Sequence, residues 1–253
     1  MTQLLEGLWA CHGGYAINKV YKKTIKLLKL ILDQPIAFTE IPYFRSAIID
    51  TFQKRASLYD NHDERGGDKY RYPLVQYKRS RGKASIFFLE EGVFHFLKSP
   101  LVFPKRLRIG SREQAFGIEL TPLQEFTVRI DQDHPQVYKI ARWMALNQKN
   151  HQRYTRLSAL EKISFLERLL SNHLISFFKG INWQPKQRFS IKITDLPTQR
   201  EQWFKGGYKA TFTLRFTTDL QLPHFIGLGK APSVGYGVIS AVPRESRSPS
   251  SWY

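Results

Sequence analysis

The chain has 253 residues, 42% of them apolar, which is enough for one large domain or two domains of about a hundred residues each. Its 39 Lys and Arg against 21 Asp and Glu give a net charge of +18, which indicates a polyanionic partner such as nucleic acid. No apolar run approaches the roughly 20 residues of a spanning helix and there is one cysteine, which excludes a helical membrane protein, a disulfide framework and a cysteine-zinc cluster.

The first elements that the sequence predicts are a strand and a helix. Apolar residues alternate over residues 22–32, a pattern typical of a strand, and a turn follows at residues 33–35. Thr39 can cap a helix in which apolar residues recur at helical spacing, and we expect this helix to end near Ala56. A polar loop at residues 58–70 then separates the helix from the next strands.

Two further strands are predicted at residues 72–78 and 84–89, on either side of a basic turn that is typical of a hairpin. A short helix at residues 91–97 and a strand near residues 103–109 follow. The order strand, helix, strand, strand, helix, strand is that of a ferredoxin-like βαββαβ unit, which we place at residues 20–118.

The second half of the chain predicts a unit of the same kind at residues 119–243. It contains a helix that begins at the capping box Ser158-x-x-Glu161 and ends at Gly180. Four strands are expected at residues 126–130, 189–193, 210–216 and 238–242. We therefore predict an α+β protein of two tandem ferredoxin-like, RRM-like domains, followed by a disordered tail at residues 244–253.

A glycine signature precedes the last predicted strand, within residues 222–239. It consists of two Gly-x-Gly pairs separated by five residues, namely Gly227, Gly229, Gly235 and Gly237. Glycine permits positive φ, so successive amides can turn toward one anion and form a phosphate-binding nest, which Lys230 and Ser233 would complement. A Walker loop is excluded because Ala231 and Pro232 follow the lysine, whereas an ordinary glycine hairpin is the alternative.

This glycine pattern, just before the last strand of a very basic chain, resembles the glycine-rich loop of the repeat-associated RNA-binding (RAMP) superfamily. Within it, the pattern is most similar to that of the CRISPR repeat-processing endoribonucleases. Asn61-His62, followed by Tyr72-Pro-Leu-Val-Gln-Tyr-Lys78 and Gly82-Lys83-Ala84-Ser85-Ile86, resembles the histidine loop and hairpin of one subgroup of those nucleases. The resemblance implies two tandem ferredoxin-like domains that hold RNA on one face.

Positive charge is concentrated between Ala141 and Ser190, where nine Lys or Arg accompany two Glu. We expect RNA to bind six of these cations, before and along the capped helix, namely Arg142, Lys149, Arg153, Arg156, Lys162 and Arg168. Such binding weakens steeply with salt, because it releases counterions from the RNA. A merely solvated helix face is the alternative, and Trp143, Tyr154 and Tyr208 are either stacking partners for bases or core residues.

RNA carries its own nucleophile, the ribose 2′-hydroxyl beside each phosphate. Without a metal, an enzyme needs a base for that proton, an acid for the leaving 5′-oxygen and a positive charge for the phosphorane. His62 lies in the polar loop, and a histidine side chain suits either proton transfer. The resemblance implies that His62 is the catalytic histidine of the subgroup, and an exposed loop histidine without a role is the alternative.

A second catalytic group is expected shortly after His62. The partner in the subgroup is a tyrosine at a similar distance, so the resemblance favours Tyr70 over Lys69, and a strand-edge aromatic residue is the alternative for Tyr70. Asp60, His62 and Glu64 alternate and can hold a metal in extended chain, but the cluster lacks further ligands nearby. We therefore expect no metal and no cofactor.

The predicted function is that of a metal-independent endoribonuclease that cleaves CRISPR repeat RNA, the pre-crRNA, into guide RNAs. The resemblance implies 5′-hydroxyl and 2′,3′-cyclic phosphate ends, and a product retained within an interference complex with other subunits. The alternatives are a non-catalytic RAMP subunit that binds guide RNA and a general single-stranded RNA-binding protein. We expect a cytoplasmic protein with no membrane partner, and the sequence leaves open whether it forms a homodimer.

Overall fold

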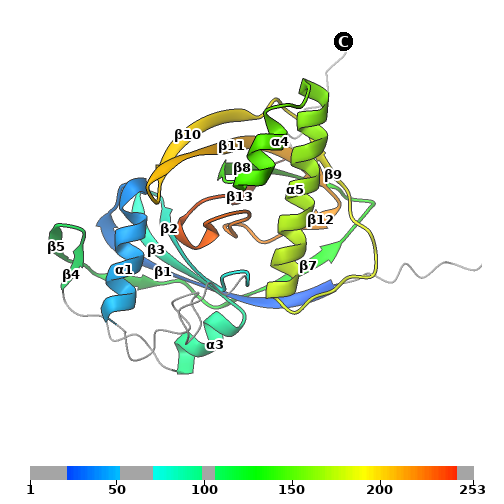
Figure 1. Cartoon of the computed structure of the whole chain (residues 1–253). Helices are drawn as coiled ribbons and strands as arrows, with labels where there is room; N and C mark the ends of the chain where they lie inside the picture. The colour runs from blue at the N-terminus through cyan, green and yellow to red at the C-terminus, as the bar shows by residue number, and fades with distance from the viewer. Residues whose placement is uncertain (1–21, 52–70, 99–105, 244–253) are drawn as a thin grey trace, which may run out of the picture.

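Figure 1 shows the computed structural model, which describes residues 22–51, 71–98 and 106–243. Two antiparallel sheets, each accompanied by helices, form the framework. The predicted loop at residues 58–70 and the tail at residues 244–253 lie outside these ranges. Within them, no helix is both long enough and apolar enough to cross a membrane.

The first sheet has the order β12-β7-β1-β3-β2, and β6 also pairs with β1. Its strands are β1 (Lys22–Pro35), β2 (Val75–Ser80), β3 (Lys83–Leu89), β6 (Ile118–Leu120), β7 (Gln124–Ile130) and β12 (Leu220–Gln221). β2 and β3 form the predicted hairpin, whose two-residue turn has a positive φ at Arg81 (49°) and Gly82 (87°). Turns of this kind match the twist of the flanking strands, so local chemistry fixes the hairpin.

Two helices accompany this sheet at positions that the sequence predicts (Figure 1). They are α1 (Ile41–Thr51), which follows the 3-10 turn η1 (Phe38–Glu40), and α3 (Glu91–Lys98). Ile41, Phe44 and Ile48 of α1 join Val93 and Phe96 of α3 in one buried cluster. Apolar side chains of β1, β2 and β3 complete that cluster, so the helices bury one face of the sheet.

The second sheet has the order β10-β11-β8-β13, and β9 pairs with β11. Its strands are β8 (Gln136–Trp143), β9 (Ile191–Ile193), β10 (Thr198–Phe204), β11 (Gly207–Thr218) and β13 (Val238–Ala241). In chain order, β8, β10, β11 and β13 take the same places as β1, β2, β3 and β7 in the first sheet. In both sheets the first strand lies between the third and the fourth, which is the ferredoxin-like order, so the predicted fold is confirmed.

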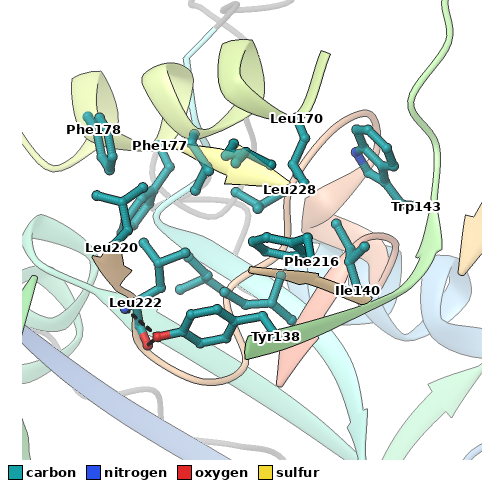
Figure 2. Close-up of a cluster of buried hydrophobic side chains, with 14 of the residues drawn as sticks. Tyr138, Ile140, Trp143, Leu170, Phe177, Phe178, Phe216, Leu220, Leu222 and Leu228 are labelled. Atoms are coloured by element: carbon teal, nitrogen blue, oxygen red, sulfur yellow. Dashed lines mark hydrogen bonds between the residues drawn. The ribbon is translucent and has the colours of Figure 1, made fainter. Parts of the chain in front are cut away.

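The helices of the second unit are α4 (Gln148–Tyr154) and α5 (Ala159–Gly180). α5 begins at the predicted capping box, where the Ser158 amide donates to Oε2 of Glu161 at 2.9 Å. Figure 2 shows Leu170 and Phe177 of α5 in the same buried cluster as Phe216 of β11. That cluster also contains side chains of β1, β3 and β7, so the two units share one core.

Two predicted strands pair differently from the expectation. The part of the strand near residues 103–109 that the structure describes lies in a separate hairpin, formed by β4 (Arg106–Ile109) and β5 (Arg112–Ala115). The fourth place in the first sheet belongs to β7 instead, although residues 126–130 were expected to open the second unit. β7 buries Val128 and Ile130 in the shared core, whereas β4 is a four-residue strand with two exposed arginines.

Several elements have no counterpart in the sequence prediction, among them β8, β10 and α4 of the second unit. β8 is central in the second sheet and buries Tyr138, Ile140 and Trp143. Lys139 and Arg142 interrupt these apolar positions and are both exposed. No strand was expected here because these charges interrupt the apolar pattern, and Arg142 was assigned to the RNA-binding cations.

Candidate nucleic-acid interface

The glycine signature lies between β12 and β13, in the place of the second helix of a ferredoxin-like unit. Only the 3-10 turn η3 (Pro232–Val234) is helical there, and it contacts β2 of the first unit. The Gly227 amide donates to Oε1 of Gln76 on β2 at 3.0 Å, and Gln76 is fully buried. The loop therefore connects the second unit to the first.

Three further amides of the loop bond within the protein. The Leu228 amide donates to the Gly237 carbonyl at 2.9 Å, and the Lys230 amide donates to the Met144 carbonyl at 3.0 Å. The Gly237 amide donates to the Arg142 carbonyl at 3.2 Å. The last two bonds hold the loop to the end of β8, so the Lys230 and Gly237 amides are not free for the phosphate nest that the signature predicts.

At two of the glycines, neighbouring atoms lie too close to leave room for a side chain. A Cβ on Gly229 (φ 89°) would lie 2.6 Å from Nε1 of Trp143. A Cβ on Gly237 (φ 63°) would lie 1.9 Å from the Leu228 carbonyl oxygen. Gly229 thus allows the loop to pack closely against Trp143 of β8, and Gly237 allows the two arms of the loop to approach each other.

The same backbone contacts bring two predicted RNA-binding cations to one end of β8. Arg142 has a φ of 49° where the pairing of β8 with β11 is irregular, and its guanidinium carbon lies 4.1 Å from the centre of the Phe38 ring. The Arg142 and Lys230 side chains are both exposed, whereas Ser233 is half-buried. The junction of the two units thus presents positive charge beside the glycine loop.

His173 of α5 lies close to this junction. Its Nδ1 accepts a hydrogen bond from Nε1 of Trp143 at 3.2 Å. Burial of the ring, with a further contribution from the positive charge of Lys230, lowers the pKa of His173 to about 4. His173 is therefore neutral at pH 7 and acts as a fixed acceptor for the buried indole.

The remaining predicted cations lie on α4, on α5 and between them. Arg153 and Arg168 both contact the Phe165 ring, at 5.6 and 5.0 Å from its centre, and Lys162 lies 5.4 Å from that of Tyr154. Four of the predicted cations in this region are exposed, namely Lys149, Arg153, Arg156 and Arg168. The aromatic contacts order the long side chains while their charges face solvent.

The predicted stacking residues divide into core and surface. Trp143 is fully buried and Tyr154 is 9% exposed, so both belong to the core. Tyr208 is 68% exposed on β11, and its ring lies 5.2 Å from that of Trp203 on β10. Trp203, which is 64% exposed, was not predicted; an aromatic residue opposite Tyr208 in the hairpin was the available signal.

The predicted catalytic residues His62, Lys69 and Tyr70 lie outside the described residues, as do the acidic neighbours of His62. Tyr72, the second described residue after them, packs against Phe177 of α5 with ring centres 5.2 Å apart. Burial raises the pKa of Tyr72, which makes it unsuited to proton transfer. Among the described residues, no three His, Cys, Asp or Glu gather as a metal site.

Two family models match the chain. The model of the Cas6b N-terminal domain matches residues 23–126, and the model of the Cas6b C-terminal domain matches residues 131–242. This chain belongs to the Cas6b family. The resemblance to CRISPR repeat-processing endoribonucleases is thereby confirmed, and the two Cas6b matches meet within β7 and the turn after it.

Two solved structures share the fold of this chain, and one protein is similar in sequence to part of it. A crystal structure of Cas6b is 19% identical, covers 87% of this chain and all of its own, and superposes with a TM-score of 0.79. A crystal structure of the CRISPR RNA processing endoribonuclease Cas6b is 17% identical over 87% of this chain and all of its own, with a TM-score of 0.64. An uncharacterized protein of Methanocaldococcus jannaschii is 25% identical over 103 residues, which are 41% of this chain and 69% of that protein.

Proposed function

We propose that the protein is an endoribonuclease that cleaves CRISPR repeat RNA into guide RNAs. The observation that carries this proposal is the match of both Cas6b domains, over residues 23–126 and 131–242. A solved structure of the same fold, at a TM-score of 0.64, is named as a CRISPR RNA processing endoribonuclease. The net charge of +18 suits an RNA substrate.

In this proposal the RNA backbone follows the exposed cations of the second unit. Arg142 and Lys230 bind phosphates at the unit junction, beside the glycine loop, and the cations of α4 and α5 bind further phosphates. The exposed pair Trp203 and Tyr208 offers ring faces for unpaired bases.

The proposed chemistry needs no metal. His62 takes the proton of the 2′-hydroxyl, whose oxygen attacks the adjacent phosphorus, and the bond to the 5′-oxygen breaks as that oxygen gains a proton. Tyr70 or Lys69 stabilises the phosphorane or supplies that proton. One product carries a 2′,3′-cyclic phosphate and the other a 5′-hydroxyl. The enzyme then retains the repeat-derived end of the guide within a cytoplasmic interference complex.

The direct test is cleavage of the cognate repeat RNA in EDTA, with wild type and with His62→Ala. We expect wild type to cleave at one position, and His62→Ala to cleave at least about a hundredfold more slowly, because general acid–base catalysis contributes about 10²–10⁴-fold. His134→Gln, at an exposed histidine in the turn between β7 and β8, is the control and should cleave like wild type.

The outcome separates the proposal from its alternatives. Tight binding of the repeat without cleavage by either protein would favour a guide-binding RAMP subunit. Equal binding of repeat and random RNA would favour a general single-stranded RNA-binding protein. Cleavage that EDTA abolishes would contradict the metal-independent mechanism.

A further inference from the structure

A pocket of about 200 Å³ lies beside β1, next to the segment that leads from β12 into the glycine loop. The aromatic rings of Phe87, Phe126 and Phe225 line it. Polar groups in the lining come from Lys29, Thr121 and His224. Aromatic walls with a cation at their edge are typical of sites for an unpaired base.

The pocket lies where the outer partner of β1 changes. β6 pairs with β1 from Leu30 onward, and β7 pairs with it as far as Leu27. Between them the Lys29 amide donates to Oγ1 of Thr121 at 3.1 Å, and the Thr121 amide donates to the Lys29 carbonyl at 2.9 Å. The chain on this side of the pocket is therefore held by hydrogen bonds to a central strand.

Phe225 forms one wall with a backbone conformation that is rare for a bulky residue, at a φ of 76°. Its amide donates to the Ile239 carbonyl at 3.0 Å, and its ring lies 6.2 Å from that of Phe87, at an angle of 61°. Backbone outliers of this kind cluster at ligand sites, where the surrounding structure holds them.

Two lysines lie against these rings. Nζ of Lys29 is 5.1 Å from the centre of the Phe225 ring. Nζ of Lys78 is 5.2 Å from the centre of the Phe87 ring and 5.6 Å from that of Phe225. Lys78 is 1% exposed, and its amine has no hydrogen-bond partner among the residues that the structure describes. A buried amine without an acceptor is costly and calls for an explanation beyond the fold.

We propose that this pocket binds one unpaired base of the RNA, stacked against Phe225 and Phe126, with the adjoining phosphate at Lys29. The volume of about 200 Å³ is below the range of about 300–1,000 Å³ that drug-sized ligands occupy, and it suits a single nucleobase. Lys78 is not part of the lining, but its amine lies against Phe87 and Phe225, which are. The inference rests on the proposed RNA substrate, and it adds a base-binding site to the cations of the second unit.

The test is a cycle of RNA and protein changes, measured as binding affinity. A set of repeat RNAs, each with one abasic nucleotide, is titrated against the His62→Ala protein, and gels check that the RNA stays intact. One abasic position should weaken binding roughly tenfold, because stacking of a base is worth about one to two powers of ten in affinity. In Phe225→Leu, the affinity for intact RNA should fall by the same factor. The abasic nucleotide at that position should then cause no further loss of affinity.

Phe126→Leu repeats the cycle at a second aromatic residue of the lining, so that a folding defect in one variant does not decide the result. Phe94→Leu, at a ring 54% exposed on α3, is the matched control and should keep the abasic penalty. The proposed pocket would be overturned if the abasic nucleotide weakened binding as much in both wall variants as in the parent protein. It would also be overturned if no single abasic position weakened binding, or if the protein bound no RNA. If the abasic penalty disappears in the wall variants but wild type does not cleave the repeat, the pocket is upheld and the nuclease proposal is rejected. If wild type cleaves but the penalty stays in the wall variants, the nuclease proposal stands and the pocket is rejected.

Discussion

At the scale of single residues, Lys78 is the group that the fold explains least. Its amine is buried on β2, and burial lowers its pKa well below the ordinary value of 10.5. Between this lowered pKa and 10.5, the unfolded chain therefore holds a proton that the folded protein has released. Since the unfolded state binds more protons, the free energy of unfolding contributed by this group rises as the pH rises toward 10.5.

Lys78→Met should make the protein more stable. Methionine fills a similar space without a buried amine, so the free energy of unfolding at pH 7 should rise by about 1–3 kcal/mol. Its increase between pH 7 and 10 should also become smaller. Urea denaturation at several pH values measures both effects, with Lys83→Met at an exposed position as the control. A loss of stability in Lys78→Met would show that the amine is satisfied in the folded protein.

At the scale of elements, the glycine loop is held by contacts that its own sequence does not reveal. Gly237 and Gly206 both have positive φ, at 63° and 77°. A Cβ on Gly237 would collide with the Leu228 carbonyl, whereas a Cβ on Gly206 would meet nothing within 4 Å. An alanine at Gly206 therefore introduces backbone strain alone, whereas an alanine at Gly237 introduces backbone strain and a steric collision.

Gly206→Ala should cost about 1–2 kcal/mol of stability, from the left-handed conformation alone. Gly237→Ala should cost at least about 2 kcal/mol more, because the two arms of the loop at Leu228 and residue 237 must also move apart. Thermal and urea denaturation of the two variants gives the difference. Equal losses of stability in the two variants would mean that the loop can shift to make room for the Cβ. Close packing at Gly237 would then not explain the glycine signature.

Local patterns predicted the elements that local chemistry fixes. The capping box at Ser158 and Glu161 marks the start of α5, and the turn at Gly82 marks the β2–β3 hairpin. Pairing between distant segments was less accessible, because nothing near residues 126–130 shows that they pair with β1. The bond that holds the Gly227 amide was equally inaccessible, since its acceptor Gln76 lies 151 residues away.

At the scale of the whole molecule, the two ferredoxin-like units share a core and are joined by the glycine loop. One buried cluster contains side chains of both sheets and of α5, and Tyr236 of the loop packs between the rings of Phe38 and Phe204, at 5.0 and 5.3 Å. We expect the two units to unfold together, in a single calorimetric transition. Two separate transitions would contradict a common core.

Gln76 tests this junction directly, because its amide group is buried between the units. Gln76→Leu removes the acceptor of the Gly227 amide, so the free energy of unfolding should fall by about 1–3 kcal/mol. The denaturation midpoint measures the loss. Gln114→Leu, in the hairpin of β4 and β5, is the control and should change stability by less than about 0.5 kcal/mol. An equal effect of the two changes would contradict the role of this bond.

We propose that the molecule cuts RNA with its own side chains and the 2′-hydroxyl of the substrate. The most direct measurement is mass spectrometry of the products formed from the cognate repeat RNA in EDTA. We expect one upstream fragment that ends in a 2′,3′-cyclic phosphate and one downstream fragment that begins with a 5′-hydroxyl. Fragments that begin with a 5′-phosphate, or an uncut repeat, would contradict it.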